Sequence, residues 1–347
     1  MSGSGHPGAS AGDRTAARIL VAGTGAIGSV FACLLREAGH DVTALGRERH
    51  VGEIAASGLG VEGIWGEHHA DGIVPAAGPG DLAADYDAVL VTCKSYQTAE
   101  LLEQIGDRAA ADGAVISLQN GLGNVERLQA VHAGRGVERV VAGRVIFGAE
   151  ITGRATVRVT VEAEPVLLGR PGGGHDRRAA DWARTFDEAG VHCRATDAIE
   201  AALWGKVFYN AALNPLGALL GLTYGELAAD TERRAVMDRV IAEAHAVAQA
   251  EGVSLPWASA AEYIEHFHAN LVPSTAGHRS SMLQDIERGK PTEIDAICGE
   301  VCRRGDAHGI EVSLNRLLTV LVRARVGRGR DRPADDERTR SRTREGR

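Results

Sequence analysis

The chain has 347 residues, which is enough for about two domains of ordinary size. Hydrophobic residues make up 44% of the sequence and charged residues 24%, which excludes a wholly disordered chain. The net charge is −8, but residues 323–347 contain ten Arg and five acidic residues, so this end carries +5 and the rest −13. An acidic body argues against nucleic acid as the main ligand, and we interpret the basic end as a solvated terminus.

The sequence predicts a protein without membrane spans, because no stretch of about 18 apolar residues occurs. Residues 1–17 are polar and Gly-rich, and they lack the apolar segment of a secretory signal. The five cysteines are odd in number, and we interpret Cys298 and Cys302 as neighbouring buried thiols and not as a metal pair. We therefore expect a reduced, cytoplasmic compartment, no metal site, and disordered tails at 1–17 and 324–347.

Strands and helices are predicted to alternate in the first part of the chain. A buried strand over 18–22 is followed by a Gly-rich turn, an apolar helix that ends before Gly39, and a second strand over 42–45. Helices are expected near 98–105 and after 123, and further strands at 88–93, 114–118, 140–146, 156–160, 165–168 and 192–195. This alternation predicts a parallel, doubly wound sheet over residues 18–195.

Only helical periodicity follows. Helices are predicted over 199–222, 231–251, 257–267, 280–287, 292–308 and 315–322. The expected fold class is therefore α/β, with an N-terminal Rossmann-type doubly wound sheet over 18–195 and an all-helical C-terminal domain over 196–323.

The turn after the first strand reads Gly23-Thr24-Gly25-Ala26-Ile27-Gly28. In such a run the first Gly permits a tight turn, the second lets a pyrophosphate approach the backbone, and the third lets helix and strand pack closely. Unpaired N–H groups and the positive dipole end at the start of the helix also favour phosphate. We predict that these six residues bind a dinucleotide, with a purely structural Gly-rich turn as the alternative.

The end of the second strand bears on the choice of cofactor. NAD-binding proteins usually carry Asp or Glu there to bind the ribose 2′-OH. This chain instead reads Leu45-Gly46-Arg47, and Arg47 offers a guanidinium to a 2′-phosphate. The sequence therefore predicts NADP(H), with an exposed loop Arg as the alternative.

Lys94 and Asn120 follow two other predicted strands, at the sheet edge where ligands bind. Lys94 could contact the phosphate or ribose of the cofactor, and Asn120 a ribose or substrate oxygen. The alternatives are a solvated Lys and a plain turn Asn beside Gly121.

A polar stripe is predicted on the first helix of the second domain. Lys206, Asn210 and Asn214 are spaced i, i+4 and i+8, which stacks them on one face with a drift of about 40°. Their neighbours are apolar, and a buried Lys is costly unless it is paired or used. The stripe therefore predicts catalytic or binding residues, with a solvent-facing stripe as the alternative.

A later segment reads Thr292-Glu293-Ile294-Asp295. Thr292 is predicted to cap a helix, with Asp295 completing an approximate capping box. Glu293 is then an acid of the first turn, a position that the helix dipole alone would explain.

Together these segments resemble the ketopantoate reductase (2-dehydropantoate 2-reductase) family. The matching segments occur in the family's order, cover about residues 18–322, and are 23–28, 92–97, 119–123, 204–216, 280–285 and 291–295. The resemblance implies NADPH-dependent reduction of the 2-oxo acid 2-dehydropantoate to (R)-pantoate, in pantothenate and coenzyme A biosynthesis.

The resemblance also implies a role for each site residue. Lys206 becomes the general acid, and Glu293 lies beside it and the nicotinamide. Burial would lower the pKa of Lys206 towards the operating pH, and Glu293 would oppose that shift. Besides the Gly-rich turn and Glu293, the cofactor contacts are Arg47, Lys94, Asn120 and, more weakly, the backbone of Ala149. The substrate contacts are Asn120, Lys206, Asn210, Asn214 and Ser281.

Tyr224 and His278 stand where the family often has Asn, on the side of the substrate. The sequence therefore leaves open a different 2-oxo acid on the same fold. A non-catalytic NADP(H)-binding regulatory protein is a minor alternative, which the loss of Lys206 would have favoured. DNA or membrane binding through the basic end is opposed by the acidic body. The oligomeric state stays open, with a homodimer as one alternative.

Overall fold

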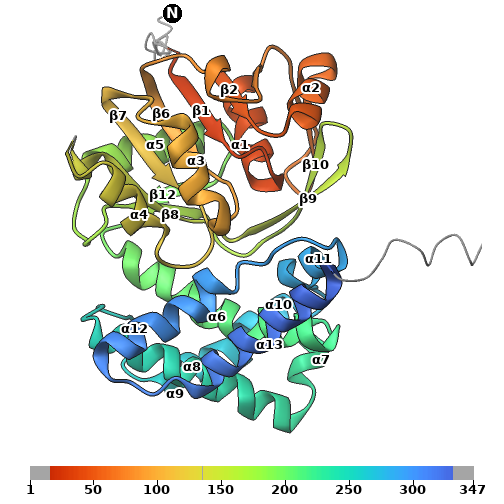
Figure 1. Cartoon of the computed structure of the whole chain (residues 1–347), viewed down its shortest axis with the longest axis vertical. Coiled ribbons are helices and arrows are strands. Elements are labelled where there is room, and N and C mark those ends of the chain that lie inside the picture. The colour runs from red at the N-terminus through yellow and green to blue at the C-terminus, as the bar shows by residue number, and fades with distance from the viewer. Residues whose placement is uncertain (1–15, 135, 331–347) are drawn as a thin grey trace, which may run out of the picture.

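The computed structural model describes residues 16–134 and 136–330, which form an α/β part and a helical part, one below the other in Figure 1. Within these residues an eight-stranded sheet has the order β12-β11-β8-β7-β6-β1-β2-β5. In chain order its strands are β1 (Arg18–Ala22), β2 (Asp41–Leu45), β5 (Val74–Ala76), β6 (Tyr86–Val91), β7 (Ala109–Ser117), β8 (Val140–Arg144), β11 (Val166–Gly169) and β12 (Cys193–Ala195). Neighbouring strands run parallel, except that β11 is antiparallel to β8.

The strand order places a ligand site. β1 pairs with β2 on one side and with β6 on the other, so the order of the sheet reverses at β1. In sheets of this kind ligands bind outside the carboxyl ends of the strands at such a reversal. The carboxyl ends of β1 and β6 lead into Gly23 and Thr92, so the predicted Gly-rich turn and the segment before Lys94 lie at this edge.

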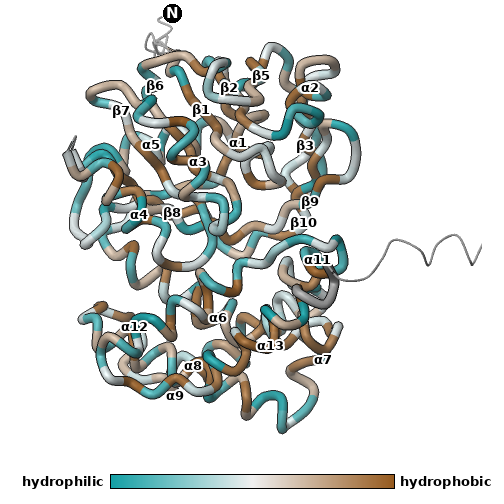
Figure 2. The backbone as a smooth tube through the Cα atoms, in the orientation of Figure 1, coloured by the Kyte–Doolittle hydropathy of each residue, from teal (hydrophilic) through white to brown (hydrophobic). Residues whose placement is uncertain are grey.

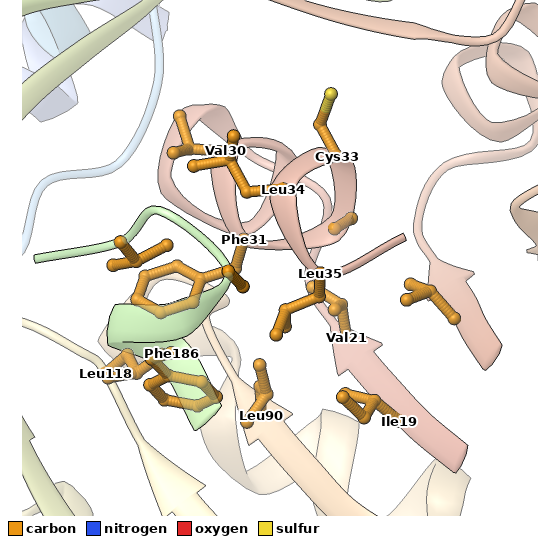
Figure 3. Close-up of a cluster of buried hydrophobic side chains, with 14 of the residues drawn as sticks. Ile19, Val21, Val30, Phe31, Cys33, Leu34, Leu35, Leu90, Leu118 and Phe186 are labelled. Atoms are coloured by element: carbon orange, nitrogen blue, oxygen red, sulfur yellow. The ribbon is translucent and has the colours of Figure 1, made fainter. Parts of the chain in front are cut away.

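Helices cover both faces of the sheet. α1 (Ala26–Glu37) and α5 (Arg177–Glu188) share one buried cluster with Ile19 and Val21, as Figure 3 shows. α3 (Thr98–Ile105) and α4 (Asn124–Val131) share another with the alternate residues Leu20 and Ala22. This alternation is what the period of two along a strand requires when both faces are buried. The expected doubly wound sheet is confirmed.

A second sheet packs on the outer side of α1. Its order is β4-β3-β10-β9, formed by β3 (Leu59–Gly63), β4 (His68–Ala70), β9 (Phe147–Gly153) and β10 (Thr156–Glu162). The sequence predicts one strand over 140–146, but β8 ends at Arg144 and β9 begins in the other sheet. The prediction also misses β3, β4 and β5, as well as α2 (Glu48–Ser57) and α5.

Helices make up the chain from Ile199 onward. They are α6 (Ile199–Leu220), α7 (Tyr224–Ala228), α8 (Thr231–Ala250), α9 (Ala260–His266), α10 (Val272–Ser274), α11 (Ser281–Glu287), α12 (Glu300–His308) and α13 (Ser313–Arg330), with π-turns at Phe267–Leu271 and Asp295–Gly299. α6 is central and packs against α8, α11 and α13. Figure 2 shows hydrophobic residues along β1 and β2 of the α/β part and along the inner helices of the helical part.

α13 corrects one boundary. The sequence predicts a helix that ends at 322 and a disordered tail from 324, but α13 continues to Arg330. Arg323 binds the Asp295 carboxylate, and the guanidinium of Arg325 donates to the carbonyl of Leu219 at 2.5 Å. Most of the two predicted tails, residues 1–15 and 331–347, lies outside the described residues. In the described part no helix is long and apolar enough to cross a membrane.

α6 contains a proline without breaking. Pro215 has no N–H, so the carbonyl of Ala211 loses its partner within the helix. The thiol of Cys298 lies 3.9 Å from that carbonyl and donates a weak hydrogen bond to it. Cys298 and Cys302 are both buried free thiols, as the sequence predicts.

Candidate active site

The turn after β1 has the shape that a pyrophosphate needs. A Cβ on Gly23 would lie 2.5 Å from the backbone N of Cys93, and one on Gly28 would lie 2.2 Å from the carbonyl oxygen of Gly23. At Gly25, which precedes α1, a Cβ would meet no atom within 4 Å, and no described side chain caps the helix. The N-terminal, positive dipole end of α1 is therefore uncapped and open at Gly25, which fits the phosphates of a dinucleotide.

Arg47 lies at the far end of this edge and is exposed at the N-cap position of α2. Burial lowers the pKa of Lys290, the nearby cations Arg47, Arg288 and Lys94 lower it further, and the carboxylate of Asp285 opposes the shift. Mutual repulsion among cations is relieved by an anion. This group of cations suits an anion, and the cofactor contacts of Arg47 and Lys94 stay predictions.

Lys94 is held by two carboxylates of the helical part. Its Nζ lies 2.8 Å from Asp285 Oδ2 and 3.4 Å from Glu293 Oε2. Burial opposes the charge of Lys94, but Glu293 and Asp285 raise its pKa above the ordinary value. The backbone N–H of Ser95 also donates to Glu293, at 3.1 Å. Both parts of the molecule therefore contribute to the surroundings of Lys94.

Lys206, Asn120 and Glu293 form one hydrogen-bonded chain. The Nζ of Lys206 donates to Asn120 Oδ1 at 2.6 Å and to the carbonyl of Val145 at 2.5 Å. The amide nitrogen of Asn120 in turn donates to Glu293 Oε2 at 3.2 Å. These contacts join α6 to the ends of two strands of the sheet. The structure thus brings together three residues that are 86 and 173 positions apart along the chain.

Burial makes Lys206 a stronger acid. Loss of water lowers its pKa to about 8, Glu293 opposes the shift, and the cation of Arg144 adds to it. The sequence predicts the effects of burial and of Glu293, and both are confirmed. An ammonium group with a pKa of about 8 can give up a proton near neutral pH far more readily than a solvated Lys.

The other two members of the stripe lie further along α6. Asn210 and Asn214 are both buried, with 8% and 5% of their surface exposed. The hydroxyl of Tyr224 donates to Asn214 Oδ1 at 2.7 Å, and the ring of Tyr224 lies 5.2 Å from that of His278. The two residues that depart from the family pattern are therefore in contact with each other and with the stripe.

Ser281 and Ala149, two further predicted site residues, make no direct contact with Lys206 in the described structure. Ser281 is the exposed first residue of α11, whereas its neighbour Ser280 caps that helix by accepting from the N–H of Leu283 at 3.1 Å. Ala149 lies in β9, where it pairs with Val159. In the described residues, the direct contacts around Lys206 do not include either residue.

Comparison with known proteins supplies the family. A model described as ketopantoate reductase PanE/ApbA matches residues 19–172, and one for its C-terminal domain matches residues 198–326. The 2-dehydropantoate 2-reductase of Aquifex aeolicus is 35% identical over 309 residues, which cover 89% of this chain and 96% of that protein. The chain belongs to the ketopantoate reductase family.

Two solved structures are similar to this chain, and each match covers 90% of this chain and 99% of the chain in the solved structure. One is a PanE/ApbA family ketopantoate reductase from Ralstonia eutropha, with 32% identity and a TM-score of 0.77. The other is D-mandelate dehydrogenase with NADH and anilino(oxo)acetate, with 26% identity and a TM-score of 0.80.

In this ketopantoate reductase fold, sequence reasoning missed three polar groups at the site: Arg144, Asp285 and the N–H of Ser95. Arg144 is buried at the end of β8 and pairs with Glu164 at 2.5 Å. An Arg that ends a strand next to a predicted ligand edge is a signal that could have found it.

The local structure around Glu293 also differs from the prediction. Thr292 is predicted as a helix cap, but the π-turn begins at Asp295 with Ile294 at its N-cap position. Glu293 therefore precedes the helix. Its carboxylate is held by Ser95, Asn120 and Lys94, so its position does not depend on a helix dipole.

Proposed function

We propose that this protein reduces 2-dehydropantoate (ketopantoate) to (R)-pantoate with NADPH. The observation that carries the proposal is the position of Lys206 where the two parts of the molecule meet. Its ammonium group donates a hydrogen bond to Asn120, and its pKa is lowered to about 8. Relatives that bear the name 2-dehydropantoate 2-reductase support the substrate. The open Gly-rich turn and the exposed Arg47 support NADPH as the cofactor.

The chemistry follows from what surrounds the reacting carbonyl. When bound, the dihydronicotinamide supplies hydride to the carbonyl carbon of the 2-oxo acid. Negative charge then develops on the carbonyl oxygen, which needs a nearby proton donor. Lys206 gives that oxygen a proton from Nζ and becomes neutral, a change that its desolvated surroundings favour.

Other residues orient the two reactants. Asn120 holds Lys206 through its carbonyl oxygen, so the ammonium group keeps one direction. Asn210 and Asn214 offer amide groups for the carboxylate or hydroxyl of the substrate. Ser281, exposed at the start of α11, completes the proposed substrate contacts. The backbone of Ala149 stays a proposed, weaker cofactor contact.

A second candidate is the reduction of a 2-oxo acid with an aromatic side chain. The structure of D-mandelate dehydrogenase with NADH and anilino(oxo)acetate matches this chain with a TM-score of 0.80. Tyr224 also bonds to Asn214, and the ring centroid of His278 lies 5.2 Å from that of Tyr224. Both observations favour testing an aryl substrate next to ketopantoate.

The test is oxidation of NADPH, followed by its absorbance, with ketopantoate, phenylglyoxylate and 3,3-dimethyl-2-oxobutanoate, each repeated with NADH. We expect the highest kcat/KM with ketopantoate and NADPH. A higher kcat/KM with phenylglyoxylate would assign the second candidate. If none of the three 2-oxo acids is turned over, both candidate functions are refuted.

We further propose that residues 18–195 form the cofactor-binding domain and that residues 196–323 supply the proton and, together with Asn120, the substrate contacts. The dehydration of Lys206 where these two parts meet supports this division of labour. A cytoplasmic location is also proposed, and all five cysteines being free thiols supports it.

A further inference from the structure

Tyr224 donates the hydrogen bond that fixes the side-chain amide of Asn214. The phenol hydroxyl lies 2.7 Å from Asn214 Oδ1, and both residues are buried, with 3% and 5% of their surface exposed. No described residue accepts a hydrogen bond from Asn214 Nδ2, and that nitrogen is not fully enclosed. The carbonyl end of the amide is therefore occupied, and the NH₂ end is left for a ligand or water.

The ring of Tyr224 cannot turn freely. Its ring centroid lies 5.7 Å from that of Tyr209 at an interplanar angle of 86°, and 5.2 Å from that of His278. The backbone N–H of Tyr224 donates to the carbonyl of His278 at 3.1 Å. Aromatic packing and a backbone bond thus aim the hydroxyl at one atom of α6.

The phenol remains a donor at every working pH. Burial raises the pKa of Tyr224 well above its ordinary value, so the hydroxyl keeps its proton. A hydroxyl that is always protonated keeps Asn214 Oδ1 occupied. The amide of Asn214 therefore has one stable orientation, with its donors turned away from Tyr224.

We propose that Tyr224 is a positioning residue that sets Asn214 as a pure hydrogen-bond donor towards an acceptor oxygen of the 2-oxo acid. The proposal rests on the proposed function, because it needs Asn214 to contact the substrate. Lys206 is proposed to take the reacting carbonyl oxygen, so the acceptors left for Asn214 are a carboxylate oxygen and the hydroxyl oxygen, and ketopantoate carries both. Tyr224 then contributes to substrate binding without touching the substrate.

The test is steady-state kinetics of Tyr224→Phe, which removes the hydroxyl and keeps the ring. Because the hydrogen bond that orients Asn214 is lost, KM for ketopantoate should rise about 3- to 10-fold. The value of kcat should change little, because the contact exists in both the ground state and the transition state. The Kd of NADPH should stay at the wild-type value. Tyr263→Phe is the matched control, since it removes a buried phenol bonded at 2.8 Å to the carbonyl of Gly205 and should leave KM unchanged.

A double-mutant cycle separates positioning from general loosening. In an Asn214→Ala background, Tyr224→Phe should cause no further rise in KM, because the group that it orients is already gone. Independent, multiplying effects of the two substitutions would overturn the proposal. So would an unchanged KM in Tyr224→Phe while the wild-type protein turns over ketopantoate. If the wild-type protein turns over no 2-oxo acid at all, the proposed function fails first.

The two sources of the acceptor oxygen can be told apart with 3,3-dimethyl-2-oxobutanoate, which keeps the carboxylate and lacks the hydroxyl. If Tyr224→Phe raises KM for both acids alike, Asn214 binds the carboxylate. If KM rises only for ketopantoate, Asn214 binds the hydroxyl. Either pattern supports Tyr224 as the residue that sets the donor.

Discussion

Glu293 and Arg144 act on the pKa of Lys206 with opposite sign, which gives a paired prediction. The carboxylate of Glu293 raises that pKa, and the cation of Arg144 lowers it. Lys206 must be protonated to act as the acid, so kcat/KM should be flat below its pKa and fall as the pH rises through about 8. Removing either charge should move this basic limb of the profile.

The size of the Glu293 effect can be worked from the hydrogen-bonded chain. Two contacts of 2.6 and 3.2 Å through the Asn120 amide separate the charges. At an effective dielectric constant of about 20, unit charges roughly 7 Å apart interact by about 2.4 kcal/mol, which equals about 1.7 pKa units. Glu293→Gln should therefore move the basic limb down by about 1 to 2 pH units.

Arg144→Met should move the limb to higher pH. The shift should be smaller than the one for Glu293→Gln, because Glu293 affects the pKa of Lys206 more strongly than Arg144 does, and Arg144 is itself paired with Glu164 at 2.5 Å. Glu164 is half-exposed, so water can solvate it once Arg144 is gone. The assay is kcat/KM for ketopantoate from pH 6 to 10, with Glu287→Gln as an exposed carboxylate control that should leave the profile in place. Shifts of the same sign in both variants, or an unmoved limb in Glu293→Gln, would refute Lys206 as the proton donor.

The remaining predictions concern the proton donor, the cofactor and the Gly-rich turn. Lys206→Ala should lower kcat about 10²- to 10⁴-fold with little change in the Kd of NADPH, and near wild-type kcat would show that the proton comes from elsewhere. Arg47→Ala should weaken NADPH about 10- to 100-fold and leave NADH almost unchanged, since only NADPH carries the 2′-phosphate; equal losses for the two cofactors would contradict this. Gly25→Ala should keep the wild-type Tm, since its Cβ meets nothing within 4 Å, but should weaken NADPH about tenfold or more. In contrast, Gly28→Ala should lower Tm, because its Cβ would lie 2.2 Å from a carbonyl oxygen, and Gly52→Ala, also in open space, is the control for both.

The parts of the site that could be predicted from the sequence are those defined by the spacing of residues close together in the chain. The Gly-rich turn follows β1 and opens α1, and the i, i+4, i+8 spacing places Lys206, Asn210 and Asn214 on one helix. The desolvation of Lys206 could be predicted because its helical neighbours Trp204 and Val207 are apolar and buried. Each of these inferences needs only residues within about two turns of a helix or one strand.

The parts that sequence missed depend on partners far along the chain. Asp285 meets Lys94 across 191 positions, and no local pattern distinguishes it from other acids of the helical part. β3 pairs in parallel with β10. It is short and Gly-rich, so the β-propensity of its own residues does not predict a strand. Similarly, the break between β8 and β9 arises because the chain passes from one sheet to the other, which the apolar run over 140–146 conceals.

Glu293 links the fit of the two parts of the molecule to the strength of the acid. Its carboxylate has 6% of its surface exposed and accepts from the Ser95 N–H, the Asn120 amide and the Lys94 ammonium, all of which belong to the α/β part. Lys206, on the helical side, likewise makes its two hydrogen bonds to Asn120 and to a carbonyl of the α/β part. Since the pKa of Lys206 is lowered first by burial, any separation of the two parts would rehydrate Nζ and return it towards the weak acidity of a solvated Lys. The bonds of Lys206 to Asn120 and Val145 therefore join the two parts and keep water from Nζ, whereas Glu293 limits how far the pKa falls.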